Sequence, residues 1–349
     1  MTETVASLKP RADASLKSRA DLPPAVGRHH PGLPLRLGTR GSPLALTQTQ
    51  MFLQSLGSCC PVLRQMNAFE SHVIRTTGDA SQASGARLAD LGGKGMFAKE
   101  IHEALLAGRI NFAVHSAKDL ETFLPPGIRL ACTLPREDPR DAMVLASRQE
   151  AAGPARYGRL AHGAVIGSSS VRRQAQLLHA RPDLQVRTIR GNVQTRLTTV
   201  REGAFAASFL AAAGLVRLGL ADEIDILLDT ETMLPAACQG IVAITVRECD
   251  EELCELLSSI TDADSHVQAL AERSVLAELD GSCLTPVAAY AQLLPDARMH
   301  LMALAARADG SFLLRRSVEC ARIDGVRAGA ELGAALRRDS PADIFEGPR

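Results

Sequence analysis

The chain has 349 residues, a length that predicts two or three domains. Hydrophobic residues make up 46% and charged residues 22%, which excludes disorder, collagen and coiled coil for most of the chain. The 39 basic and 39 acidic side chains balance, which argues against a general nucleic-acid binder. No apolar run reaches the ~18 residues of a membrane span. Aromatic residues make up only 3%, without Trp, so we expect no base-stacking surface.

Cysteine usage and the N-terminal segment indicate where the protein works. The eight cysteines include no C-x-x-C pair, and no histidine cluster has the spacing of a metal site. We therefore expect a reduced, cytoplasmic protein without a metal centre. Residues 1–34 contain Ala, Ser, Pro and mixed charges but no apolar core, so they are not a secretory signal. We expect a disordered N-terminal extension there.

The first two thirds of the chain alternate between strand and helix patterns. A short strand is expected at residues 35–38, followed by a helix with Ser42 as its N-cap and Pro43 at its first position. Further strands are expected at residues 110–114, 164–167 and 185–189, and helices follow the last two. Alternating strands and helices predict an α/β architecture with mostly parallel sheets.

The last section has a different pattern. A helix is expected at residues 269–279, then a glycine loop that contains Cys283, then strands at 287–293, 299–307 and 311–320. Asp309-Gly310 forms the turn between the last two strands. A final helix at 328–338 completes a small α+β domain.

The distribution of basic residues points to an anionic ligand. Of the 39 basic residues 34 are Arg, and three of the five Lys fall between residues 94 and 118. Residues 167–217 hold eight Arg and two acids, a local charge of +6. Arg172 and Arg173 stand in the first turn of a helix, where they oppose the helix dipole, so we expect a bound polyanion to offset them. Arginine forks match carboxylate or phosphate groups. The alternative is a solvated basic face.

Other polar motifs stand where strands end, the place where open α/β sheets bind ligands. Arg40 precedes a helix N-terminus and could complete an anion site. Asp119 follows the strand at 110–114, and Lys94 stands in a glycine-rich loop. Cys283 on its glycine loop is placed for reaction. Each also has an ordinary explanation: a capped helix, a capping Asp, a flexible loop and an inert Cys.

The order and combination of the motifs are more specific than any one of them. They are Thr39-Arg40-x-Ser42-Pro43, Gly92-Gly93-Lys94-Gly95, His115-Ser116-x-Lys118-Asp119, Arg136-Glu137-Asp138-Pro139-Arg140-Asp141, Ser169-Ser170-x-Arg172-Arg173, Arg190-Gly191-Asn192-Val193-x-Thr195-Arg196, Ala213-Gly214-Leu215-x-Arg217 and Gly281-x-Cys283. Together they strongly resemble the porphobilinogen deaminase (hydroxymethylbilane synthase) family, over more than nine tenths of the chain.

The resemblance implies two α/β lobes of the type II periplasmic-binding-protein kind, with the active site in the cleft between them, and a small C-terminal α+β domain. The first lobe would comprise residues 35–135 plus 238–262 and the second residues 136–237. Residues 263–349 would form the domain that carries the cofactor.

The resemblance also implies a transferase of tetrapyrrole and heme biosynthesis. It would polymerise four porphobilinogen molecules, with loss of ammonia, into hydroxymethylbilane on a dipyrromethane cofactor held by a thioether to Cys283. Asp119 matches the catalytic aspartate, which binds pyrrole N–H groups and stabilises developing positive charge. The acetate and propionate groups of cofactor and substrate would account for the arginine cluster.

The residues that the resemblance assigns to cofactor and substrate binding are mostly cationic or hydroxyl-bearing. They are Arg40, Ser42, Lys94, Ser116, Lys118, Ser168, Ser169, Ser170, Arg172, Arg173, Arg190, Gly191, Asn192, Arg196, Arg217, Gln239 and Arg273. The resemblance implies a monomer that acts on a small molecule, with no metal, nucleic acid or membrane partner.

Two other functions stay open at the level of sequence. A non-catalytic anion-binding relative is favoured by departures from the family pattern at Ala83, Asp90, Cys238 and Ser282. Cys238 stands where the family usually has Gly. A hydrolase that uses Cys283 as its nucleophile lacks a partner, because the nearest preceding histidine, His266, has no motif around it.

Overall fold

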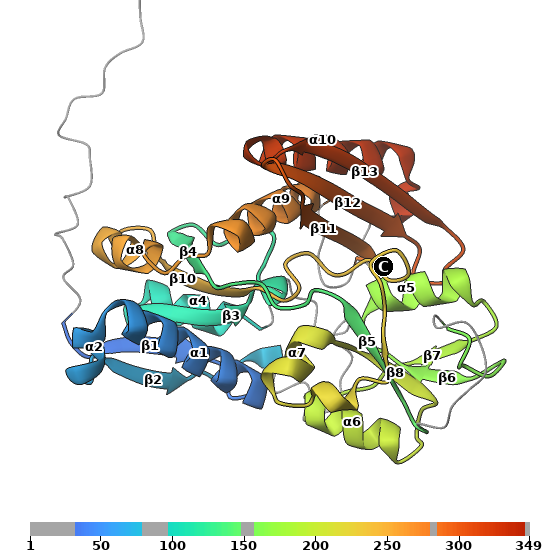
Figure 1. Ribbon diagram of the computed structural model, residues 1–349, viewed down its shortest axis with the longest axis horizontal. Helices are drawn as coiled ribbons and strands as arrows, with labels where there is room; N and C mark the ends of the chain where they lie inside the picture. Colours follow the sequence, from blue (N-terminus) through green and yellow to red (C-terminus); the bar gives the residue numbers. More distant parts are fainter. Residues whose placement is uncertain (1–31, 79–96, 148–156, 280–284, 346–349) are drawn as a thin grey trace, which may run out of the picture.

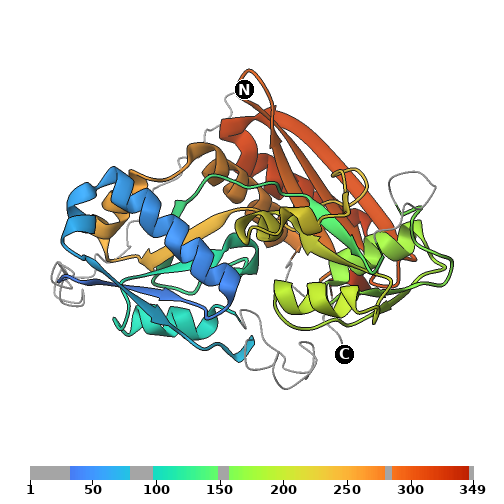
Figure 2. The same ribbon diagram turned by 60° about the horizontal axis from the view of Figure 1, so that its bottom comes forward.

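The computed structural model describes residues 32–78, 97–147, 157–279 and 285–345. Within these ranges the strands form three sheets, each covered by helices (Figure 1). The first and second sheets lie in two lobes, and the third sheet belongs to a C-terminal unit that packs against both (Figure 2). The predicted fold class is confirmed: two α/β lobes and a small α+β domain.

The first sheet has five strands in the order β2-β1-β3-β10-β4. Its strands are β1 (Leu35–Thr39), β2 (Phe69–Val73), β3 (Phe112–Ser116), β4 (Ile128–Thr133) and β10 (Val242–Arg247). Its helices are α1 (Pro43–Cys59), α2 (Pro61–Gln65), α4 (Lys99–Leu106) and α8 (Glu251–Ser258). Strands β2, β1 and β3 are parallel, whereas β10 runs antiparallel to both of its neighbours.

The second sheet repeats this plan in the order β7-β6-β8-β5-β9. Its strands are β5 (Asp141–Leu145), β6 (Val165–Gly167), β7 (Gln185–Arg187), β8 (Ala207–Ala211) and β9 (Ile226–Leu227). The helices are α5 (Val171–Ala180), α6 (Val193–Arg201), α7 (Ala212–Arg217) and the 3₁₀ turn η4 (Ala221–Glu223). Here β5 is the strand that runs antiparallel to its neighbours.

The prediction of mostly parallel sheets therefore holds with one exception in each sheet. Strand β5 follows β4 in sequence but lies in the second sheet, and β10 follows β9 but lies in the first. The chain thus crosses between the lobes twice. In each sheet the strand that directly follows a crossing, β5 or β10, runs antiparallel to its neighbours. The two crossing segments, residues 134–140 and 228–241, run side by side (Figure 1).

The C-terminal unit is an antiparallel sheet with two helices on one face. It contains β11 (Val287–Leu293), β12 (Arg298–Ala306), β13 (Leu313–Ala321), α9 (Ala263–Leu279), α10 (Gly325–Asp339) and the short turns η5 (Arg322–Asp324) and η6 (Ala342–Ile344). The strands begin within two residues of their predicted starts. Helix α9 begins six residues earlier than predicted, with Asp262 at its start accepting a hydrogen bond from the Ser265 amide.

Helix starts have side-chain caps, of which the one at Ser42 was predicted. The Ser42 hydroxyl accepts a hydrogen bond from the Ala45 amide at 3.3 Å, with Pro43 in the first turn of α1. Asn192 caps α6 in the same way through the Thr195 amide, at 2.9 Å. Such caps satisfy amides that a helix leaves unpaired. They also place Ser42 and Asn192 at the ends of strands, where the polar motifs lie.

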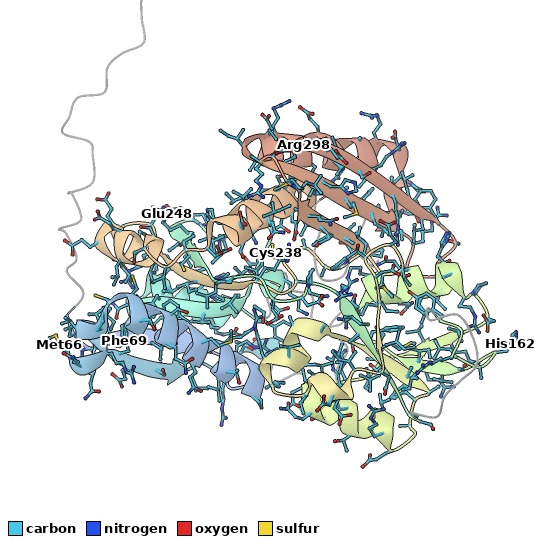
Figure 3. The ribbon with its side chains drawn as sticks, viewed as in Figure 1. Met66, Phe69, His162, Cys238, Glu248 and Arg298 are labelled. Atoms are coloured by element: carbon cyan, nitrogen blue, oxygen red, sulfur yellow. The ribbon has the colours of Figure 1, made fainter. Side chains whose placement is uncertain are left out.

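A buried ion pair joins the C-terminal unit to both crossing segments. The Glu272 side chain on α9 is 0% exposed, and its Oε1 lies 2.5 Å from Arg136 Nη1. Glu272 also accepts hydrogen bonds from the amides of Cys238 and Ala291. Arg136 Nε donates to the Gln239 carbonyl at 2.9 Å. Cys238 lies near the centre of the molecule, where the three parts meet (Figure 3).

We predict that Glu272→Ala lowers the free energy of unfolding by about 3–5 kcal/mol, because it leaves the Arg136 charge buried without a partner. Urea unfolding followed by circular dichroism measures the change. The matched control is Glu331→Ala, which removes an exposed ion pair with Arg327 on α10. That control should cost about 0.5 kcal/mol or less. Equal losses in the two variants would contradict the prediction.

Candidate active site

A small cavity lies where β3 ends beside the start of α1. It has a volume of about 60 Å³, and its lining includes Arg40, Ser42, Phe97, Ser116 and Asp119. Asp119 ends the 3₁₀ turn η3 (Ala117–Asp119), which directly follows β3. Four predicted site residues therefore meet at one point, with Phe97 as an additional wall.

The cavity holds one anionic and one cationic side chain in contact range. Arg40 Nη1 lies 3.8 Å from Asp119 Oδ2, and the Asp119 side chain is 35% exposed. The Arg40 guanidinium also stacks 4.3 Å from the centre of the Phe97 ring. Ser116 is held in place by reciprocal hydrogen bonds with Gln48, at 3.0 and 3.1 Å. A carboxylate that is both held and accessible can accept N–H bonds from a ligand.

Neutral imidazoles form the wall behind this cavity. His115 is buried, and its Nε2 lies 2.9 Å from the Thr245 hydroxyl. Burial lowers the pKa of His115 to about 3 and that of the neighbouring His102 to about 4. Neither ring is charged at neutral pH. Among the described lining residues, Arg40 and Asp119 therefore supply the charge.

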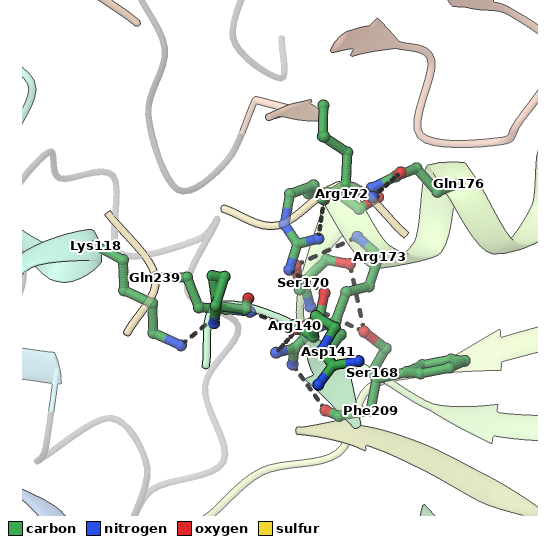
Figure 4. Close-up of polar contacts among 12 residues, drawn as sticks. Lys118, Arg140, Asp141, Ser168, Ser170, Arg172, Arg173, Gln176, Phe209 and Gln239 are labelled. Atoms are coloured by element: carbon green, nitrogen blue, oxygen red, sulfur yellow. Dashed lines mark hydrogen bonds and ion pairs between the residues drawn. The ribbon is translucent and has the colours of Figure 1, made fainter. Parts of the chain in front are cut away.

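Lys118 connects the first lobe to the second crossing segment. Its ammonium donates to Gln239 Oε1 at 3.4 Å (Figure 4). The Lys118 side chain is exposed to solvent. The Gln239 amide in turn donates to Asp141 Oδ1 at 2.9 Å and to the Pro139 carbonyl at 2.7 Å. Lys118 is thus an exposed cation with a neutral hydrogen-bond partner.

Asp141, the first residue of β5, holds two of the predicted anion-binding arginines. Its side chain is 0% exposed, with Arg172 Nη2 at 2.8 Å and Arg173 Nη2 at 2.7 Å (Figure 4). These two guanidinium groups hold the pKa of Asp141 well below its usual value. Arg172 also donates to the Leu234 carbonyl and Arg173 to the Phe209 carbonyl.

These contacts refine one sequence argument. The buried Asp141 carboxylate neutralises one of the two first-turn charges of α5, so a bound anion is not needed to offset both. A sequence cannot reveal this, since Asp141 precedes the arginines by some thirty residues. Arg172 and Arg173 keep their predicted position at the carboxyl end of β6, and their assignment to cofactor and substrate binding stays a prediction.

The predicted serines also have structural partners. Ser170 caps α5 through the Arg173 amide, and the Ser170 amide donates to Ser168 Oγ at 3.1 Å. The Ser169 hydroxyl donates to the Ile189 carbonyl. The three hydroxyls therefore shape the loop between β6 and α5 and hold its backbone at the edge of the sheet.

Two other predicted arginines, Arg196 and Arg217, contact no carboxylate among the described residues. Arg196 Nε donates to the Gly191 carbonyl at 2.9 Å, and its pKa is lowered to about 10 by burial and by the positive charges of Arg173 and Arg190. Arg217 Nη2 donates to the Gly240 carbonyl at 2.6 Å, and burial lowers its pKa.

The turn before α6 needs the glycine that the sequence places there. Gly191 has φ +100°, and a Cβ at this position would lie 2.7 Å from Thr195 Cβ. The turn brings the Gly191 carbonyl to Arg196 and aims Asn192 at the helix start. Gly191 and Asn192 are therefore supports for Arg196.

The remaining predicted residues divide into two groups. Arg273 on α9 donates from Nη2 to the carbonyls of Glu121 and Thr122, at 2.7 and 2.8 Å, so it fixes the chain that follows Asp119. Lys94 and Cys283 lie outside the described residues. Sequence reasoning missed the roles of Asp141 and Glu272, although Asp141 belongs to a quoted motif.

Comparison with known proteins gives a consistent result. Residues 35–255 match the family model "Porphobilinogen deaminase, dipyromethane cofactor binding domain", and residues 266–337 match "Porphobilinogen deaminase, C-terminal domain". Porphobilinogen deaminase of Paracoccus denitrificans is 44% identical over 90% of this chain and 97% of its own length. The chloroplastic enzyme of Oryza sativa is 44% identical over 81% of this chain and 77% of its own.

A solved structure gives a more distant likeness. The VFT2 domain of Bordetella pertussis BvgS is 17% identical with a TM-score of 0.39, and the match covers 66% of this chain and 87% of that chain. Separately, none of the helices among the described residues is long and apolar enough to cross a membrane.

We predict that Asp141 makes stability fall in acid. Its pKa is lowered on folding, so its contribution is fully present above the unfolded value of about 3.9 and is lost as the pH falls below it. Urea unfolding between pH 7 and pH 3 should show a shallower decline for Asp141→Asn than for the wild type. An identical pH dependence in the two proteins would contradict this prediction.

Proposed function

The chain belongs to the porphobilinogen deaminase family. We propose that its reaction takes place between the Asp119 cavity and the arginines of the second lobe that contact no carboxylate among the described residues. The enzyme joins four porphobilinogen molecules head to tail, with loss of ammonia, to form hydroxymethylbilane, and its cofactor is dipyrromethane. The observation that carries the proposed location is a pair of desolvated arginines that contact no carboxylate among the described residues, Arg196 and Arg217.

These cations fit a ligand that brings its own carboxylates. Each pyrrole of cofactor and substrate carries an acetate and a propionate group. Arg217 keeps a buried Nε without a hydrogen-bond partner, and Arg196 lies close to two other positive charges. A buried unpaired donor costs stability until an acceptor binds. We assign Arg190, Arg196 and Arg217 to these carboxylates, with Arg40 and Lys118 on the side of the first lobe.

Asp119 is the residue we assign to the reacting centre. When bound, the dipyrromethane primer supplies the nucleophilic α-carbon of its terminal pyrrole. The Asp119 carboxylate accepts pyrrole N–H bonds and stabilises positive charge as ammonia leaves the substrate. Arg40 holds this carboxylate from one side, and Arg273 holds the backbone that follows it. Preorganised groups of this kind need no rearrangement during the reaction.

We assign cofactor attachment to Cys283, which follows α9 by four residues. Two described cysteines are poor alternatives, because burial raises the pKa of Cys132 to about 11 and that of Cys238 to about 12. A thiol with such a pKa stays protonated at neutral pH, and the thiolate is the nucleophile. The anchoring of α9 by Glu272 and Arg273 supports this assignment, since it fixes the position of α9 relative to the segment that follows Asp119.

We further propose that the domains are residues 35–135 with 238–262, residues 136–237, and residues 263–349, after an extension at 1–34. The three sheets support these boundaries. We propose a cytoplasmic monomer that binds neither nucleic acid nor membrane. The net charge of zero supports the absence of nucleic-acid binding.

An intact-protein mass spectrum tests the covalent attachment. We expect the wild type to exceed its sequence mass by two pyrrole units and Cys283→Ser to have the unmodified mass. Cys238→Ser is the matched control, and its mass excess should persist. An unmodified wild type after incubation with porphobilinogen would favour the non-catalytic anion-binding alternative. An excess that follows Cys238 would reject Cys283 as the attachment site.

We predict that Arg196→Gln lowers kcat/KM for porphobilinogen by about 10- to 150-fold, which corresponds to about 1.5–3 kcal/mol for one charge-assisted hydrogen bond. Its stability should be unchanged or higher, because a desolvated cation beside Arg173 and Arg190 is removed. The control on the same helix is Arg201→Gln, which loses ion pairs with Glu223 and Asp225. That variant should lose stability and keep its activity. The reverse pattern would refute the assignment.

A further inference from the structure

A second, larger pocket lies away from the Asp119 cavity, between the second lobe and the C-terminal sheet. Its volume is about 490 Å³, compared with about 60 Å³ for the Asp119 cavity. Volumes of 300–1,000 Å³ at domain interfaces are typical of small-molecule sites. One side is formed by the end of α5 and the loop at Thr232, and the other by the start of β13. Helix α5 lies directly below β12 and β13 in Figure 1.

One arginine in this interdomain pocket is desolvated without an ion pair. Arg315 on β13 is half-buried and donates to the Glu231 carbonyl at 2.6 Å and to Gln176 Oε1 at 3.0 Å. Both acceptors are neutral, and burial lowers the pKa of Arg315. The neighbouring Arg316 is exposed and pairs with Asp339 at 2.9 Å. Arg315 therefore keeps a positive charge that no contacting carboxylate among the described residues neutralises.

The other polar groups of the pocket differ from Arg315. Arg181 is neutralised by Asp183 through two contacts of 2.7 Å. Gln176 is neutral and already accepts a hydrogen bond from Arg315. Arg315 thus offers the cation of the pocket that no contacting carboxylate among the described residues neutralises.

The other lining residues indicate the polarity and charge of the occupant. Tyr157, Ala180 and Leu313 supply apolar walls. The carboxylates of Glu231 and Asp229 act on Arg315 at longer range and partly offset its charge. A single negative charge is therefore favoured over the several carboxylates of a pyrrole substrate.

We propose that the interdomain pocket binds a small organic monoanion, with its oxyanion group at Arg315 and an apolar body against Tyr157 and Leu313. Because the pocket is lined by both the second lobe and the C-terminal unit, an occupant stabilises their docked arrangement by mass action. The site shares no lining residue with the Asp119 cavity, so it is separate from the proposed reaction site.

The test measures direct binding of 4-(trifluoromethyl)benzoate to the full chain by ¹⁹F NMR. We expect saturable binding of one molecule per chain, about tenfold weaker in Arg315→Gln. The matched control Arg316→Gln should bind like the wild type. The uncharged analogue 4-(trifluoromethyl)benzamide should bind at least tenfold more weakly than the benzoate.

Two further variants keep the result interpretable. Ala180→Phe fills the pocket from the exposed end of α5 and should abolish binding. Gln176→Leu removes the side chain that holds Arg315 and should weaken binding. Thermal melting confirms that each variant is folded. The proposal is overturned if folded Arg315→Gln and Ala180→Phe bind as the wild type does, if the wild type shows no saturable binding, or if porphobilinogen displaces the benzoate. None of these results depends on catalysis, so failure here is distinguishable from failure of the proposed reaction site.

Discussion

The buried carboxylate of Asp141 is the interaction on which the arrangement of both lobes depends. It stands at the first residue of β5, where the chain enters the second sheet, and it holds Arg172 and Arg173 in the first turn of α5. Through Gln239 it also reaches the segment that returns to the first lobe, and Gln239 accepts a hydrogen bond from Lys118. One desolvated charge therefore fixes the positions of groups that come from four parts of the chain. Removing a partner would leave an unpaired charge in a medium of low polarity, which is why such networks are well defined.

The arginines of the second lobe divide by whether the fold neutralises them. Arg173 and Arg201 have carboxylate partners and belong to the stability of the lobe. Arg196 and Arg217 are desolvated but contact only backbone carbonyls. Positive charges held close together without counter-ions oppose folding, and proteins retain such arrangements where a ligand compensates. In this basic cluster, contact with a carboxylate therefore separates structural arginines from those we assign to ligand binding. The residues on either side of each arginine in the sequence do not separate the two groups.

Local signals in the sequence predict a large part of this fold. They do not predict contacts between residues that are far apart in the sequence. Ser42 caps its helix as expected, because a cap depends on residues three positions away. The antiparallel strands β5 and β10 could not be foreseen, since an apolar run does not say which sheet it joins. The same limit explains why the carboxylate partner of Arg172 and Arg173 was not predicted: Asp141 is near in space but distant in sequence. The roles of Asp119, Arg196 and Arg217 stay predictions, made because their motifs stand near strand ends.

The ion pair between Glu272 and Arg136 also accommodates a departure from the family pattern, at Cys238. Cys238 has φ +61°, in the left-handed region where the resemblance places Gly, and a side chain there costs about 1–2 kcal/mol. Its amide donates to Glu272, which is itself fixed by Arg136. A charge-assisted hydrogen bond contributes a similar amount, about 1.5–3 kcal/mol, so the carboxylate can hold the backbone in this conformation. Cys238 is packed against α9 on the side of the crossing segment that faces the C-terminal unit, with its Sγ 3.8 Å from the Ala269 carbonyl. The ion pair that joins the three parts therefore stabilises the backbone conformation that Cys238 adopts.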